Sequence, residues 1–137
     1  MGISVKESAA SARDGGWRTT GHAVTFWIFA ILGVPVMIGA WFLLPLASLE
    51  EATEQGKAVA AGTSMAGTTL MLGVLPLILA HIMGLALLCT IGGRGRLRRR
   101  QGVLLGATMV LVASAIGLAI TWALSGGELI YSYEYVP

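Results

Sequence analysis

The sequence has 137 residues, of which 55% are hydrophobic and 12% are charged, and its formal net charge is +2. Typical soluble proteins contain roughly 45–50% apolar and about 25% charged residues, so these values exclude a disordered chain, a coiled coil and a nucleic-acid-binding domain, and they indicate a membrane protein. The length fits one integral membrane domain, 1–137, and a single cysteine excludes a disulfide scaffold.

Three long uncharged stretches predict three membrane-spanning helices, at about 23–47, 65–91 and 102–124. Each stretch exceeds the ~20 residues that cross roughly 30 Å of hydrocarbon. Backbone groups in lipid must be hydrogen-bonded within their own segment, and the sequence lacks the short alternating strands of a barrel. We therefore expect an all-α fold, a three-span transmembrane helical bundle.

The segment 48–64 between the first two predicted spans contains the signals of a short helix, from about Leu49 to Ala60. Ser48, followed three residues later by Glu51, has the form of a capping box. Acidic residues in a first turn suit the positive end of a helix, and Gly62 suits its C-terminal cap. We expect a structural element with no catalytic role.

Five arginines without an acidic residue fill the segment 92–101 between the second and third spans: Arg94, Arg96, Arg98, Arg99 and Arg100. Short arginine-rich loops stay in the cytoplasm, so the N-terminus is predicted inside (N-in/C-out), and the loop 48–64 and the tail 125–137 outside. We expect these side chains to set the topology and to attract anionic lipid headgroups rather than nucleic acid. The composition favours a bacterial cytoplasmic (inner) membrane.

Small residues recur on one side of two predicted spans and indicate close helix packing. They are Ala66, Gly73, Ala80 and Gly84 in the second span and Gly102, Gly106, Ala113 and Gly117 in the third. We expect these two spans to pack as a hairpin, within one chain or between copies of it.

His81 is the one ionisable side chain well inside a predicted span. Such groups are costly in lipid and are candidates for function, because a neutral imidazole can ligate haem iron, hydrogen-bond a quinone or relay a proton. The alternative is a structural hydrogen bond to a neighbouring helix, for which Thr68, Thr69, Thr108 and Ser114 are available. We expect the structural bond, and haem stays an open possibility as cofactor.

The tail alternates Tyr131, Tyr133 and Tyr135 with polar residues. This pattern is typical of an interfacial tail on the lipid surface or of a segment that binds a partner.

The sequence contains no motif for nucleotide binding, metalloprotease activity or nucleophilic catalysis. We therefore expect a non-catalytic accessory or assembly subunit of a larger membrane complex, with no catalytic activity of its own. Its expected partners are membrane lipids and either other membrane subunits or copies of itself. Two alternatives remain open: a homo-oligomeric pore or small transporter, suggested by Pro35 and Pro76 inside spans, and a redox subunit that binds haem or quinone through His81.

Overall fold

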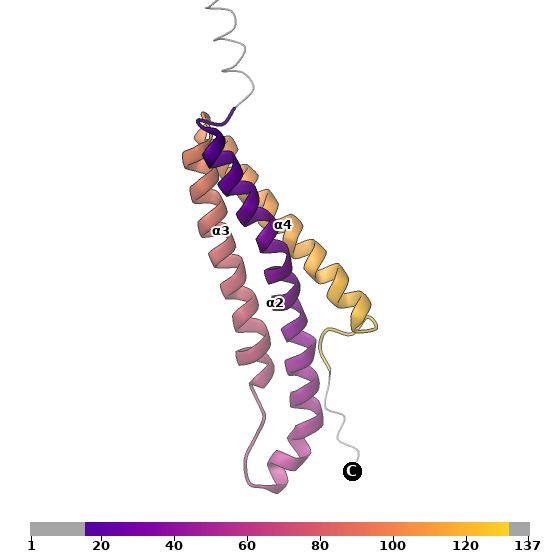
Figure 1. Ribbon diagram of the computed structural model, residues 1–137. Coiled ribbons are helices and arrows are strands. Elements are labelled where there is room, and N and C mark those ends of the chain that lie inside the picture. The colour runs from indigo at the N-terminus through magenta and orange to yellow at the C-terminus, as the bar shows by residue number, and fades with distance from the viewer. Residues whose placement is uncertain (1–15, 132–137) are drawn as a thin grey trace, which may run out of the picture. The chain divides into compact units, whose positions relative to one another are not determined.

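The computed structural model describes residues 16–131, which form three long α-helices and a short π-helix (Figure 1). The elements are α2 (Thr20–Ala60), the π-helix η1 (Thr69–Val74), α3 (Leu75–Gly95) and α4 (Arg99–Leu124). Three helices, Thr20–Ala60, Thr69–Gly95 and Arg99–Leu124, are long and apolar enough to cross a membrane. The fold is an all-α three-helix bundle, and the chain is a multi-pass integral membrane protein.

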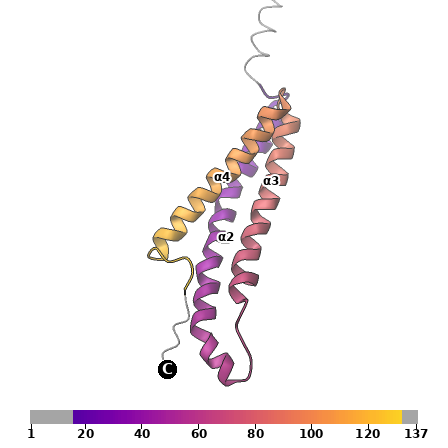
Figure 2. The same ribbon diagram turned by 180° about the vertical axis from the view of Figure 1, so that it is seen from behind.

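Contacts along the helices divide the chain into two compact units. In the first unit the described part of Met1–Gly33 packs with Met83–Leu111, and in the second Val34–Ile82 packs with the described part of Val112–Pro137. Each unit contains one stretch of α2, one of α3 and one of α4. Within each unit α3 runs antiparallel to the other two helices (Figure 1, Figure 2).

α2 is much longer than the predicted span 23–47, because the helix continues through Pro45 into the segment 48–64. Its 41 residues measure about 60 Å at the α-helical rise, about twice the thickness of the hydrocarbon core. Residues 49–60 are helical, as the sequence predicts, but they continue α2 and do not form a separate helix. The capping-box prediction for Ser48 is wrong, because the residues before Ser48 are already helical and supply the acceptors that a cap would replace.

The end of α2 agrees with the prediction for Gly62, which has a φ of +75°. Thr63 N–H donates to the Ala58 carbonyl at 2.8 Å, and Gly62 N–H donates to the Val59 carbonyl at 3.0 Å. This pair of hydrogen bonds is a Schellman motif, whose left-handed residue is usually glycine. The turn between α2 and η1 covers residues 61–68, because the second span begins at Thr69 and not at the predicted residue 65.

The π-helix η1 lies directly before Pro76 in the second span. Proline has no N–H, so the Leu72 carbonyl loses its usual donor four residues along the chain. The helix widens there, and Leu75 N–H donates to the Leu70 carbonyl, five residues back. A single π-turn of this kind keeps most backbone groups hydrogen-bonded within the span.

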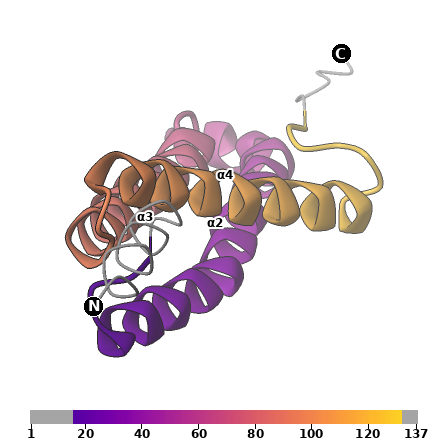
Figure 3. The ribbon, with the colours of Figure 1, turned by 90° about the horizontal axis from the view of Figure 1, so that it is seen from above.

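Glycines bring the backbones of α3 and α4 together in the first unit, where the two helices lie side by side (Figure 3). A Cβ atom added at Gly102 would lie on the backbone of Gly92, and one at Gly106 would lie 2.6 Å from the carbonyl of Leu88. This close approach leaves only residues 96–98 between the helices. The predicted ten-residue loop 92–101 is therefore mostly helical.

In the second unit, α2 is the helix that both other spans contact through glycine. A Cβ atom at Gly73 of η1 would lie 3.0 Å from the Cα of Leu44, and one at Gly117 of α4 would lie 2.9 Å from the carbonyl oxygen of Met37. The missing side chains at these two positions let η1 and α4 approach the backbone of α2.

Candidate functional site

One side chain from each helix joins a hydrogen-bonded network in the second unit: Trp41 of α2, His81 of α3 and Ser114 of α4. Trp41 Nε1–H donates to Ser114 Oγ at 3.0 Å, and Ser114 Oγ lies 2.7 Å from His81 Nε2. The indole and imidazole rings stand edge to face, with centroids 6.5 Å apart. Ser114, at the centre of the network, is only 9% exposed.

The partners of His81 define which ring nitrogen carries the proton. Its Nδ1 lies 2.8 Å from the carbonyl oxygen of Leu77, one turn earlier in α3. Because a carbonyl only accepts, Nδ1–H is the donor, and in a neutral imidazole Nε2 then accepts from the Ser114 hydroxyl. Ser114 Oγ in turn accepts from Trp41, so every polar hydrogen of the network has an acceptor.

This arrangement provides the structural hydrogen bond predicted for His81, with Ser114 as the partner. Two of the other candidates donate to a backbone carbonyl of the preceding turn instead: Thr68 Oγ1 donates to the Met65 carbonyl at 2.7 Å, and Thr108 Oγ1 donates to the Leu104 carbonyl at 2.9 Å. A haem iron requires the free electron pair of an imidazole nitrogen. The pair on Nε2 accepts the Ser114 hydroxyl, so iron binding requires loss of that hydrogen bond.

The residues predicted to pack the helices differ in burial. The four on the predicted α4 face are all buried: Gly102, Gly106, Ala113 and Gly117. Of those predicted on the second span, Gly73 is buried, Ala80 and Gly84 are half-buried, and Ala66 is exposed in the turn before η1.

The close contact between α3 and α4 uses two α3 glycines, Gly92 and Gly93, which lie in the segment predicted to be a loop. The two consecutive glycines beside arginines could have indicated this helix contact, but the same pattern is equally typical of a turn.

The arginine-rich segment is tied to the residues that precede α2 in the first unit. Arg18 N–H donates to the Gly95 carbonyl at 2.8 Å, and Leu97 N–H donates to the Gly16 carbonyl at 3.0 Å. These bonds flank an isolated antiparallel bridge between residues 17 and 96. No periodicity in the sequence indicated this pairing, because it joins two short irregular segments.

Arg96 differs from the other four arginines of its segment. Its guanidinium lies over the Trp17 ring, 5.3 Å from the centroid, and Trp17 packs on Phe26 with centroids 5.2 Å apart. The first contact is a cation–π interaction. The remaining four are exposed: Arg94, Arg98, Arg99 and Arg100. They are therefore available to headgroups, whereas Arg96 is part of the packing.

The extended end of α2 holds the turn before η1 and the start of the tail. Ser48, which is 2% exposed, accepts a hydrogen bond from Tyr131 N–H at 2.7 Å. The Glu51 carboxylate accepts from the backbone N–H of Thr69 at 2.7 Å and of Gly67 at 3.3 Å. The bonds from Thr69 lower the pKa of Glu51, which lies beyond the predicted span. Glu51 therefore caps the next helix in the chain, not its own.

Tyr131 is the member of the predicted tyrosine face that lies within the described residues, and Tyr133 and Tyr135 lie outside them. Besides the bond to Ser48, the Tyr131 hydroxyl donates to the Ser125 carbonyl at 3.5 Å. The beginning of the tail is thus held against α2, and both interpretations of the tyrosine pattern stay predictions.

Comparison of the chain with protein-family models, with curated proteins and with solved structures gives no match.

Proposed function

We propose that this chain is a non-catalytic accessory or assembly subunit of a larger membrane complex, in the cytoplasmic (inner) membrane of a bacterium and with its N-terminus inside. The proposal is carried by the exposure of α3. In the most apolar stretch of Thr69–Gly95, 6% of residues are buried inside the chain, against 22% in the corresponding stretch of α2 and 28% in that of α4. One span therefore offers most of its surface to lipid or to another helix.

The sequence of α3 supports a protein partner on that surface. Ala80 and Gly84 are four residues apart, which places two small residues on one face of the helix. Both are half-buried, so part of their surface stays accessible. Helices in lipid associate mainly through the close approach that small residues permit, because lipid provides no hydrophobic drive between them.

The hydrogen bonds that His81 forms within the chain also favour a structural role over redox chemistry. The network of Trp41, Ser114 and His81 joins three helices of the same chain and satisfies both imidazole nitrogens. A visible absorption spectrum of the chain purified with its partners tests the redox alternative. A Soret band that disappears in His81→Ala would support haem binding and contradict the proposal.

Purification from native membranes in a mild detergent tests the proposal directly. We expect the chain to co-purify with other membrane proteins, and we expect Ala80→Leu or Gly84→Leu to reduce their recovery at least fivefold. Ala119→Leu is the matched control, because it makes the same change at an exposed position of α4. Recovery of the chain as a lone monomer would refute the proposal. Recovery only with differently tagged copies of itself would favour the homo-oligomeric alternative.

A further inference from the structure

A groove of about 310 Å³ lies between α3 and α4 in the first unit. Three of its lining side chains are polar: Thr90 and Arg94 from α3 and Arg99 from α4. The wall also includes Ala86 and Val103. The groove therefore combines two guanidinium groups and a hydroxyl with an apolar surface.

The polar and apolar parts of the groove follow one another along the span. Ala86, Thr90 and Arg94 are spaced four residues apart on α3, so they lie on one face in order toward the arginine-rich end of the helix. Gly93 keeps the space open, because a Cβ atom there would lie 3.0 Å from Val103 Cγ2 and 3.6 Å from Arg99 Cγ. The layout matches an amphiphile whose charged group lies at the helix end and whose chain lies along the span.

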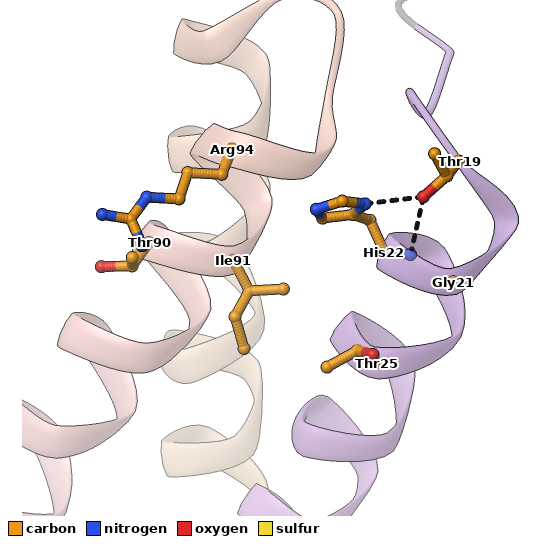
Figure 4. Close-up of a pocket in the computed structure, with 7 residues that line it drawn as sticks. All are labelled: Thr19, Gly21, His22, Thr25, Thr90, Ile91 and Arg94. Carbon is orange, nitrogen blue, oxygen red and sulfur yellow. Dashed lines mark hydrogen bonds between the residues drawn. The ribbon is translucent and has the colours of Figure 1, made fainter.

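A second hollow, on the α2 side, shares Thr90 and Arg94 with the groove and is lined by His22 and Thr25. Figure 4 shows that Arg94 extends away from His22, toward the side of Thr90. The imidazole Nδ1 of His22 is paired with the Thr19 hydroxyl at 2.6 Å. The Arg94 guanidinium therefore extends on the side of the Thr90 hydroxyl, which also lines the groove.

The arginine-rich end of the first unit carries an excess of positive charge, which favours binding of an anion from outside the chain. Within residues 16–131, the one ion pair joins Lys57 to Glu54, which are remote in sequence from the groove. Within the described segments 16–22 and 92–101, the chain has six arginines and no acidic residue. These two segments therefore supply no carboxylate to neutralise the six guanidinium groups.

We propose that the groove binds one anionic phospholipid, with its phosphate between Arg94 and Arg99 beside the Thr90 hydroxyl and an acyl chain along Ala86 and Val103. Guanidinium groups form strong, directional hydrogen bonds to phosphate oxygens. The apolar continuation of the groove favours a lipid over a soluble phosphate, because a free phosphate gains nothing from that surface. This assignment goes beyond the accessory role and beyond the general attraction of arginines to headgroups.

The test measures lipid binding to the purified full chain by native mass spectrometry, with phosphatidylglycerol, phosphatidylcholine and inorganic phosphate as separate probes. We expect phosphatidylglycerol to bind with one tight site that Arg94→Gln with Arg99→Gln weakens at least tenfold. Arg98→Gln with Arg100→Gln is the matched control: it removes the same charge from the same segment outside the groove, and we expect less than a twofold change.

Thr90→Val keeps the shape and the charge of the groove, and we expect it to weaken phosphatidylglycerol binding about threefold. This variant keeps the proposal testable if the double arginine variant fails to fold. Equal weakening by the two double variants would show diffuse electrostatic attraction and overturn the proposal, as would equal binding of phosphatidylcholine. Displacement of the lipid by inorganic phosphate at similar concentration would assign the site to a soluble anion and overturn the lipid assignment.

Discussion

Replacing Ser114 with alanine tests whether the network of three side chains stabilises the membrane-embedded fold. The Ser114 hydroxyl accepts from the Trp41 indole at 3.0 Å and donates to His81 at 2.7 Å. Its loss leaves the Trp41 N–H and the His81 Nε2 without these partners in a region where water is scarce. Because the three residues come from α2, α3 and α4, the substitution weakens two helix–helix contacts at once.

The expected magnitude follows from hydrogen bonds between helices in membranes, which contribute about 0.6 kcal/mol on average and about 1.7 kcal/mol at most. Two such bonds give a loss of about 1–3 kcal/mol in the free energy of unfolding for Ser114→Ala. The lower end applies if the unfolded chain in the micelle also finds partners for the indole and the imidazole.

Unfolding of the purified chain in mixed micelles, followed by far-UV circular dichroism as the fraction of denaturing detergent rises, measures this loss. Thr108→Ala is the matched control, because it removes an exposed hydroxyl of α4 that bonds within its own helix. We expect the control to change the free energy by no more than about 0.5 kcal/mol. A double-mutant cycle of Ser114→Ala with Trp41→Phe isolates one bond. If Ser114→Ala destabilises the chain no more than the control does, the network is not a source of stability.

Three further substitutions test other parts of the structure in the same unfolding assay. Gly102→Ala places a Cβ on the backbone of Gly92 and should lower the free energy of unfolding by about 1–3 kcal/mol through overpacking. Gly39→Ala is the matched control, because Gly39 has open space around it, and this variant should not lower the free energy of unfolding. Thr121→Val removes a fully buried hydroxyl that has no hydrogen-bond partner within residues 16–131 and should raise stability by about 1 kcal/mol or more; a loss of stability would reveal a hidden partner. The pKa of Glu51 is lowered from 4.5 by its bonds to backbone N–H groups, so its contribution to stability is complete above pH 4.5 and is lost as the pH falls through the lowered value. The Glu51→Gln variant should lack that part of the acid sensitivity, and an unchanged pH profile would contradict the capping role.

The spans were predictable because uncharged stretches of this length have few alternatives to membrane-spanning helices. The continuation of α2 through Pro45 and Ser48 was not, because a proline followed by a serine and two glutamates also fits the start of a new helix. Tertiary contacts decide between these outcomes: Ser48 bonds to Tyr131 and Glu51 bonds to the turn before η1. Both partners lie far away in sequence, where no local pattern points to them.

The candidate site shows the same limit of prediction from local sequence patterns. The sequence indicated that His81 needs a polar partner in lipid, but it offered four candidates. The choice of Ser114 depends on the rotation of α4 about its axis, which is fixed by the glycine contact at Gly117 with α2. Similarly, the small residues predicted close packing of the helices, but they did not predict that α3 uses Gly92 for this contact.

The hydroxyl of Ser48 and the backbone of Tyr131 are separated by 83 positions along the chain. A growing chain presents its amino-terminal residues first, so this contact cannot form until α3 and α4 have both been synthesised. Until then, the C-terminal end of α2 has only one of its two attachments, because the bonds that Gly67 and Thr69 donate to Glu51 need no residue beyond 69. The Ser48–Tyr131 contact is therefore among the last to form during biogenesis, and protection of this end of α2 from a protease would report its formation.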